Sequence, residues 1–114
     1  MATFEATTHP RAFAQMEGSV KTVFVVPWSP EFSVISSNDR IEFEDLGSIS
    51  IGSIRRYDSV PALLEAEGWK NVVPEAETDE EAVDAIRSSS EWNAKAEEDH
   101  GVLALRVRWA KRKS

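Results

Sequence analysis

Apolar side chains recur at every second position, or gather in β-branched runs, in several short segments of the chain. Both patterns are typical of strands with one buried face. They predict strands at Val20–Val26, Arg40–Glu44, Ile49–Tyr57 and Gly101–Trp109, with weaker candidates at Thr3–Thr7 and Glu31–Ile35. On the last strand the buried face should carry Leu103, Leu105, Val107 and Trp109.

Three positions between and within these strands indicate special backbone geometry. Asn38, in the polar stretch 36–39, is a residue that tolerates the left-handed conformation of a turn. Gly47-Ser48 is typical of the turn of a hairpin. Gly52 interrupts the alternation between Ile51 and Ile54, which predicts a β-bulge there.

Helical spacing and capping residues predict several short helices. The first carries Ala12, Phe13 and Met16 and stops at Gly18. The second is capped by Asp58 or Ser59, has Pro61 in its first turn and Leu63 and Leu64 on its apolar side, and ends at Gly68. The third begins with a capping box at Thr78–Glu81, and Ser90–Glu98 continues helically with Trp92 as its anchor.

The order of these elements predicts an α+β fold. Two strands that are separated by some forty residues of helix cannot form a hairpin, so the last strand should return to close the sheet. We therefore expect one domain over residues 1–110, a small β-barrel of five to six strands with a short N-terminal helix and a helical insert before the last strand. Residues 111–114 are expected to form a basic tail.

Composition narrows the function classes. The 114 residues suffice for one modest core. The chain has no cysteine and only two histidines, so we expect neither a metal site nor a cofactor. It also lacks a signal peptide and an apolar run of membrane-spanning length, so we expect an intracellular protein, cytoplasmic or nuclear, without a membrane partner and monomeric.

Charge is unevenly distributed along the chain. The net charge of −7 argues against a protein that simply coats nucleic acid. Acidic residues concentrate in 65–81 and 91–99, whereas basic residues crowd 106–113 and recur at Arg55 and Arg56. Two interpretations stay open: a solvated acidic face with a basic terminus, or a local basic rim around a pocket.

Several short segments, in a fixed order, resemble one known family. They are Asn38–Phe43, Arg56-Tyr57, Leu63-Leu64, Glu67-Gly68 and Gly101–Leu105. In this order they resemble the ASCH domain, a small barrel related to the PUA fold. The resemblance covers nearly the whole chain and implies a PUA-like barrel with a pocket along the first long strand.

The chain departs from this family at its N-terminal signature, roughly Gly-x-Lys-x-x-Glu-x-Arg. Gly18 and Lys21 are one residue further apart than in that signature, and Phe24 and Val26 occupy its Glu and Arg positions. Thr22, Phe24 and Val26 share one face of an extended strand. The pocket floor would then have changed from ionic to apolar in one concerted swap, since losing both members of a buried ion pair can be neutral.

The resemblance also implies a chemistry, because some relatives hydrolyse the amide of N4-acetylcytidine and others are ribonucleases. In such a hydrolase Lys21 would be the base, Glu67 the carboxylate, and position 24 the nucleophile. Phe24 has no hydroxyl, so Thr22 is the replacement candidate and we lean against an amidohydrolase.

A binding module is therefore our first expectation. Its ligand would be a nucleobase, nucleoside or short RNA, and its binding residues would be Lys21, Phe24, Val26, Trp28, Arg55, Arg56 and Tyr57. The hydrolase that uses Lys21 and Glu67 is the alternative. A protein-interaction domain with a lapsed pocket is the third.

Overall fold

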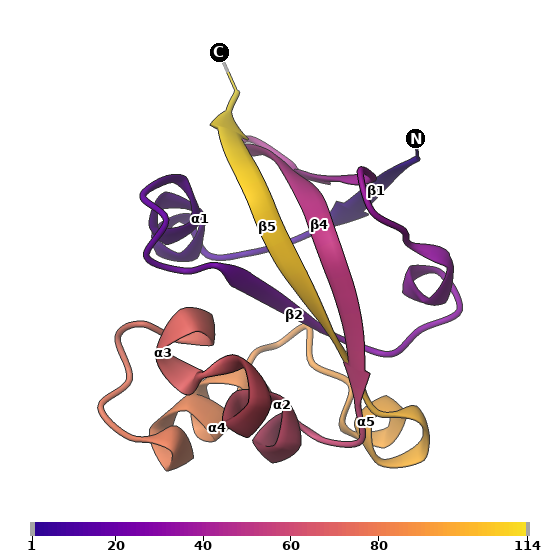
Figure 1. Cartoon of the computed structure of the whole chain (residues 1–114), viewed down its shortest axis with the longest axis vertical. Coiled ribbons are helices and arrows are strands. Elements are labelled where there is room, and N and C mark those ends of the chain that lie inside the picture. The colour runs from indigo at the N-terminus through magenta and orange to yellow at the C-terminus, as the bar shows by residue number, and fades with distance from the viewer. Residues whose placement is uncertain (1, 114) are drawn as a thin grey trace.

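Five strands form one curled sheet in this computed structural model, which describes residues 2–113. The strands are β1 (Thr3–Ala6), β2 (Val23–Pro27), β3 (Arg40–Phe43), β4 (Gly47–Tyr57) and β5 (Val102–Arg112). Their order across the sheet is β1-β3-β4-β5-β2. The β1–β3 pair is parallel and the other pairs are antiparallel. The sheet curls into a half-barrel, with β4 and β5 as its long central ribbon (Figure 1). The predicted α+β fold is confirmed.

Short helices surround the half-barrel. They are α1 (Pro10–Glu17), the 3-10 turn η1 (Phe32–Val34), α2 (Val60–Glu67), α3 (Trp69–Val72), α4 (Asp79–Arg87) and α5 (Ala94–His100). The last four all lie between β4 and β5 in the sequence and gather at one end of the sheet (Figure 1). The predicted caps are present: Ser59 accepts from the amide of Ala62, and Thr78 accepts from that of Glu81. Across residues 2–113, no helix is long and apolar enough to cross a bilayer.

Alternation along β2 and β5 divides the buried side chains into two cores. The first, the barrel core, comprises Phe4, Phe13, Met16, Phe24, Val26, Phe32, Ile35, Ile41, Phe43, Ile49, Ile51, Leu103 and Leu105. The second, the helical core, comprises Val23, Val60, Leu63, Leu64, Val72, Val73, Ala76, Ala82, Val102 and Ala104. Burial on both faces explains why β2 is an uninterrupted apolar run rather than an alternating one.

The helical insert is held by one buried carboxylate. Glu97 is only 5% exposed and accepts from the Val60 amide at 2.9 Å. It also accepts from Arg87 Nη2 at 2.6 Å and from Trp92 Nε1 at 3.1 Å. Burial acts to raise its pKa, but these hydrogen bonds outweigh burial and hold the pKa below its ordinary 4.5. Glu97 thereby ties α2, α4 and α5 together and fixes Trp92.

The predicted bulge near Gly52 is present, and a second register shift beside it changes which side chains of β5 are buried. The β4–β5 register shifts on both sides of Ile51, so that Ser50 pairs with Trp109 and Ile51 with Val107. The expectation that Trp109 lies on the buried face is therefore wrong. Its side chain is 43% exposed, with the guanidinium carbon of Arg40 lying 5.7 Å from its ring centroid.

Element boundaries near the first strands also differ from expectation. The predicted edge strand at Glu31–Ile35 is wrong, because Ser29 accepts from the amide of Phe32 and starts the 3-10 turn there. The second strand begins at Val23 rather than Val20, since the amides of Val20 and Lys21 both donate to the carbonyl of Gln15.

The hairpin turn and the last helix are displaced as well. The turn between β3 and β4 occupies residues 44–46, with Asp45 in the left-handed region, whereas Gly47 and Ser48 already belong to β4. Asn93 caps α5, so this helix starts after Trp92 instead of including it. The predicted basic tail is partly strand: β5 runs to Arg112, and Ser114 lies outside the described residues.

Candidate functional site

A cleft runs along the open side of the half-barrel, between the two strands that end the sheet. We call it the β1–β2 cleft. It holds about 560 Å³ and is lined by Glu5 and Ala6 of β1, by Phe24–Pro27 of β2 and by residues of the helices around them. This volume is in the range of small-molecule sites. The open edge of the sheet thus offers a cavity of suitable size for a nucleoside.

Lys21 is the only lysine or arginine that lines this cleft. Its side chain is 9% exposed, and its ammonium donates a hydrogen bond to the carbonyl of Val72 at the end of α3. Burial lowers the pKa of Lys21 from 10.5 to about 8, although the nearby Glu75 carboxylate acts to raise it. The ammonium therefore both anchors α3 to the start of β2 and gives the cleft a cation that loses its proton more easily than an exposed lysine.

The floor of the cleft is apolar. Phe24 and Val26 are 7% and 5% exposed, and they belong to the barrel core as well as to the cleft lining. The ring of Phe24 meets that of Phe43 edge to face, with centroids 5.3 Å apart. Phe24 and Val26 thus line the cavity with most of their surface buried, and Val25 from the other face of the strand lines it as well.

Two indoles complete the cleft lining. Trp28 follows β2, its amide donates to Gly101 O at 3.1 Å, and its ring lies 4.4 Å from that of His100. Trp92 enters from the loop before α5, held by its hydrogen bond to Glu97. Both side chains are half-buried, so each is positioned by the protein and keeps accessible surface.

Carboxylates line the cleft beside these aromatic rings. They belong to Glu5, Glu31, Glu75 and Glu91, and all four side chains are exposed. Gln15 donates to Glu75 at 2.9 Å. These glutamates and Trp92 were not predicted as site residues. They come from separate loops and helices, and no local sequence pattern indicates that these segments line one cleft.

Five of the predicted site residues lie outside the cleft lining: Thr22, Arg55, Arg56, Tyr57 and Glu67. The backbone amide of Thr22 donates to Asn71 O. Arg56 donates to the carbonyl of His100, and the hydroxyl of Tyr57 donates to Glu67. The structure thus brings Lys21, Phe24, Val26 and Trp28 together in one cavity, and it gives Lys21 the carboxylate of Glu75 rather than that of Glu67 as its neighbour.

The two arginines of β4 face opposite sides of the sheet. Arg56 pairs with Leu103 and so lies on the barrel-core side, whereas Arg55 pairs with Ala104 on the helical-core side. Opposite faces were expected from their adjacency in a strand.

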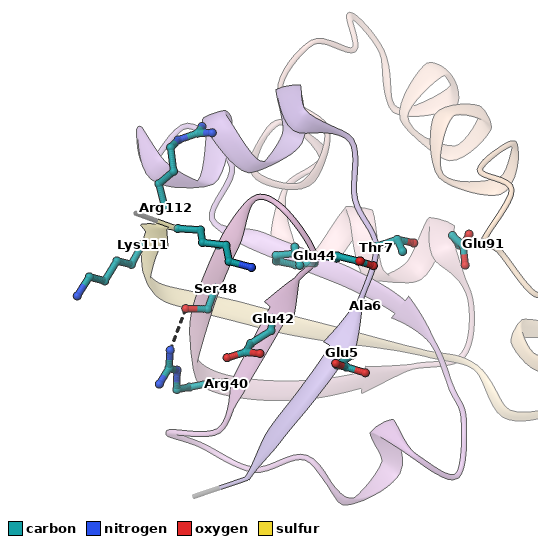
Figure 2. Close-up of a pocket in the computed structure, with 13 residues that line it drawn as sticks. Glu5, Ala6, Thr7, Arg40, Glu42, Glu44, Ser48, Glu91, Lys111 and Arg112 are labelled. Atoms are coloured by element: carbon teal, nitrogen blue, oxygen red, sulfur yellow. Dashed lines mark hydrogen bonds between the residues drawn. The ribbon is translucent and has the colours of Figure 1, made fainter.

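A second cleft lies on the outer surface of the sheet, and we call it the outer cleft. It holds about 850 Å³, and Figure 2 shows Lys111 and Arg112 at one side of it and Glu5 and Glu91 at the other. The guanidinium of Arg40 donates to Ser48 at 3.1 Å within it. Its lining mixes charges of both signs and includes no tryptophan. It suits a planar heterocycle less well than the β1–β2 cleft.

The carboxylates around these clefts do not form a metal centre. Within residues 2–113, no three histidine, aspartate or glutamate side chains converge closely enough to hold an ion.

Comparison with known proteins shows the fold. No family model matches the sequence, and no curated protein does. Among solved structures, the hypothetical protein PH0355 superposes with a TM-score of 0.86 at 24% identity, over 96% of this chain and 99% of that one. Protein PF0455 from Pyrococcus furiosus gives 0.76 at 24% identity, over 95% and 96% of the two chains.

The ASCH protein from Zymomonas mobilis is a more distant structural neighbour. It gives a TM-score of 0.63 at 13% identity, over 96% of this chain and 69% of that one. The superpositions establish a shared fold, and sequence identities this low do not extend the similarity to activity. The chain has an ASCH-like fold.

Proposed function

We propose that this protein is an ASCH-like binding module that holds a nucleobase, as a nucleoside or at the end of a short RNA, in the β1–β2 cleft. One observation carries the proposal: the same cleft is lined by a buried ammonium, Lys21, by the indole of Trp28 and by apolar side chains of β2. A planar heterocycle needs these groups, since it stacks on an aromatic ring and takes its orientation from a few polar atoms.

The charges of the cleft favour a base over a polynucleotide backbone. Its carboxylates repel phosphates, and its one ammonium already donates to Val72. Carboxylates accept hydrogen bonds from ring and exocyclic N–H groups, which every nucleobase except a fully substituted one offers. A single unstacked base is therefore a better occupant than a duplex or a long strand.

Nucleosides should raise the melting temperature of the protein, because a ligand that binds only the folded state stabilises it. The substitution Trp28→Leu should reduce that rise to a small fraction of its wild-type value, since base stacking on an aromatic ring contributes about 1–3 kcal/mol. Trp109→Leu is the matched control, because this tryptophan lines neither cleft. The measurement is a thermal-shift panel in which each variant is referred to its own ligand-free melting temperature.

If the ligand-induced rise in melting temperature falls equally in Trp28→Leu and Trp109→Leu, Trp28 is not part of the binding site. If none of the nucleosides shifts the wild-type protein at millimolar concentration, base binding itself is refuted.

Hydrolysis of an acylated base is the second candidate, favoured by one observation. Lys21, with a pKa lowered to about 8, is closer to the pKa of an effective general base than an ordinary lysine is. The hydrolase mechanism lacks a nucleophile, because Phe24 occupies the position at which the resemblance to the ASCH domain places that group. The hydroxyl of Thr22 does not line the cleft.

Release of cytidine from N4-acetylcytidine should accordingly be weak or absent. Chromatographic separation of nucleoside and product after incubation with the purified protein measures this directly. Rapid turnover that is lost in Lys21→Met would overturn the assignment as a binding module and establish the hydrolase instead.

A further inference from the structure

The β1–β2 cleft carries more negative charge than a site for a neutral base requires. Four exposed glutamates line it, at positions 5, 31, 75 and 91, and two of them, Glu5 and Glu91, also line the outer cleft. The opposing charge comes from Lys21, which is buried, donates to Val72 and lies beside Glu75. His9 also lines the cleft, and its Nδ1 accepts from the amide of Arg11. The cleft as a whole therefore attracts cations.

This negative charge is distributed rather than focused. The described residues contain no three acidic or histidine side chains that meet as metal ligands. A small metal ion requires several oxygen ligands at short range. Carboxylates spaced around a cavity instead match a cation whose charge is delocalised over a ring.

Two indoles line the same cavity, and both are fixed by contacts outside it. Trp28 is held through its amide and by the ring of His100, and Trp92 through its hydrogen bond to Glu97. The face of an indole carries partial negative charge and attracts a cation that lies over it. Tryptophan is the strongest of the aromatic side chains in this respect. The aromatic surface and the glutamates thus favour the same sign of ligand charge.

We infer that the β1–β2 cleft prefers a nucleobase whose ring carries a positive charge, such as a purine methylated on a ring nitrogen, over its neutral counterpart. This inference rests on the proposed function and specifies its ligand class. The charged ring stacks on an indole, and the glutamates offset its charge. Lys21 does not oppose it strongly, because its ammonium already donates to the Val72 carbonyl and is offset by the nearby negative charge of Glu75.

Two isomeric ligands separate charge from shape and size. At neutral pH 1-methyladenosine is protonated and its ring is cationic, whereas its isomer N6-methyladenosine is neutral. Isothermal titration of both into the wild-type protein should show about tenfold tighter binding of 1-methyladenosine, as expected when a cation–π contact and carboxylate attraction act together. The preference should shrink as salt is added, because the glutamates are exposed.

The glutamate contribution is isolated by Glu31→Gln, since the Glu31 side chain makes no cap hydrogen bond and lines the β1–β2 cleft but not the outer cleft. This variant should bind 1-methyladenosine less tightly and N6-methyladenosine unchanged. Glu98→Gln is the control, because Glu98 is exposed on α5 and lines neither cleft.

Equal affinity for the two isomers, or tighter binding of the neutral one, would refute the preference for a cationic ring while leaving base binding intact. Absence of binding by both isomers and by unmodified nucleosides would refute the preference and the proposed function together.

Discussion

Replacing Phe24 with glutamate should lower the free energy of unfolding by about 4 kcal/mol, the cost of burying a charge without a partner. Phe24 is 7% exposed, packs against the ring of Phe43 and belongs to a core of apolar side chains. The substitution places a carboxylate where the family resemblance has one, but without the arginine that accompanies it there. Urea denaturation of the variant and the wild-type protein measures the difference.

Adding Val26→Arg should recover part of this loss. Residues 24 and 26 lie on the same side of β2, because they pair with Leu105 and Leu103 of the barrel core. Each single substitution buries a charge without a partner, whereas the double variant pairs the two charges. The loss of unfolding free energy in the double variant should therefore be smaller than the sum of the two single losses by about 1–3 kcal/mol.

The control for this cycle is Phe24→Glu combined with Val25→Arg. Val25 packs against the helical core, on the other face of the strand, so its arginine cannot reach the carboxylate. Strict additivity for Phe24→Glu with Val26→Arg, or equal recovery in the control, would contradict a concerted replacement of an ion pair by apolar residues.

Replacing Glu97 with alanine should destabilise the protein by about 3 kcal/mol, because a buried carboxylate that accepts several hydrogen bonds is removed. The substitution leaves the Val60 amide, the Trp92 indole and the Arg87 guanidinium without their shared acceptor. Glu98→Ala, on the same helix but exposed, should change stability by less than about 0.5 kcal/mol. Equal effects of the two substitutions would show that the Glu97 network contributes nothing.

The contribution of Glu97 should also depend on pH. Its pKa in the folded protein is held below the ordinary 4.5, so folding favours the ionised form. The stabilisation is therefore fully present above pH 4.5 and is lost as pH falls through the lower folded-state pKa. Unfolding free energies of wild type and Glu97→Ala should converge in acid, and a gap that stays constant at low pH would contradict the account.

Much of the fold follows from local sequence patterns. Alternation at Ile41 and Phe43, the glycine-centred bulge near Gly52, and caps such as Ser59 each act within a few residues, so the sequence predicts them correctly. The prediction for Trp109 was wrong because β5 carries one extra residue, Arg108, between the pairs Ser50–Trp109 and Ile51–Val107, and alternation along β5 does not predict this irregularity. Residues 31–35 were misassigned because the hydrogen bond that the Phe32 amide donates to the Ser29 side chain outweighs weak alternation.

The candidate site is less predictable from the sequence than the fold. Alternation along β2 indicates that Phe24 and Val26 share a face, and the prolines around Trp28 indicate a loop. By contrast, the presence of Trp92 and Trp28 in the lining of one cleft depends on how the helical insert folds back onto the sheet, which only tertiary packing determines. Tertiary packing also makes Glu75 the charged neighbour of Lys21, and no sequence pattern near either residue predicts this proximity.

Nitrogen–proton correlation spectra of the labelled protein, recorded during titration with a nucleoside, test most directly whether the β1–β2 cleft is the binding site. The account predicts that the amide shifts of Val23–Val26 and Trp28, together with the indole signals of Trp28 and Trp92, move with one common affinity. The amides of Arg108–Lys113 at the outer cleft should stay in place. Shifts confined to the outer cleft, with residues 23–28 unchanged, would contradict it.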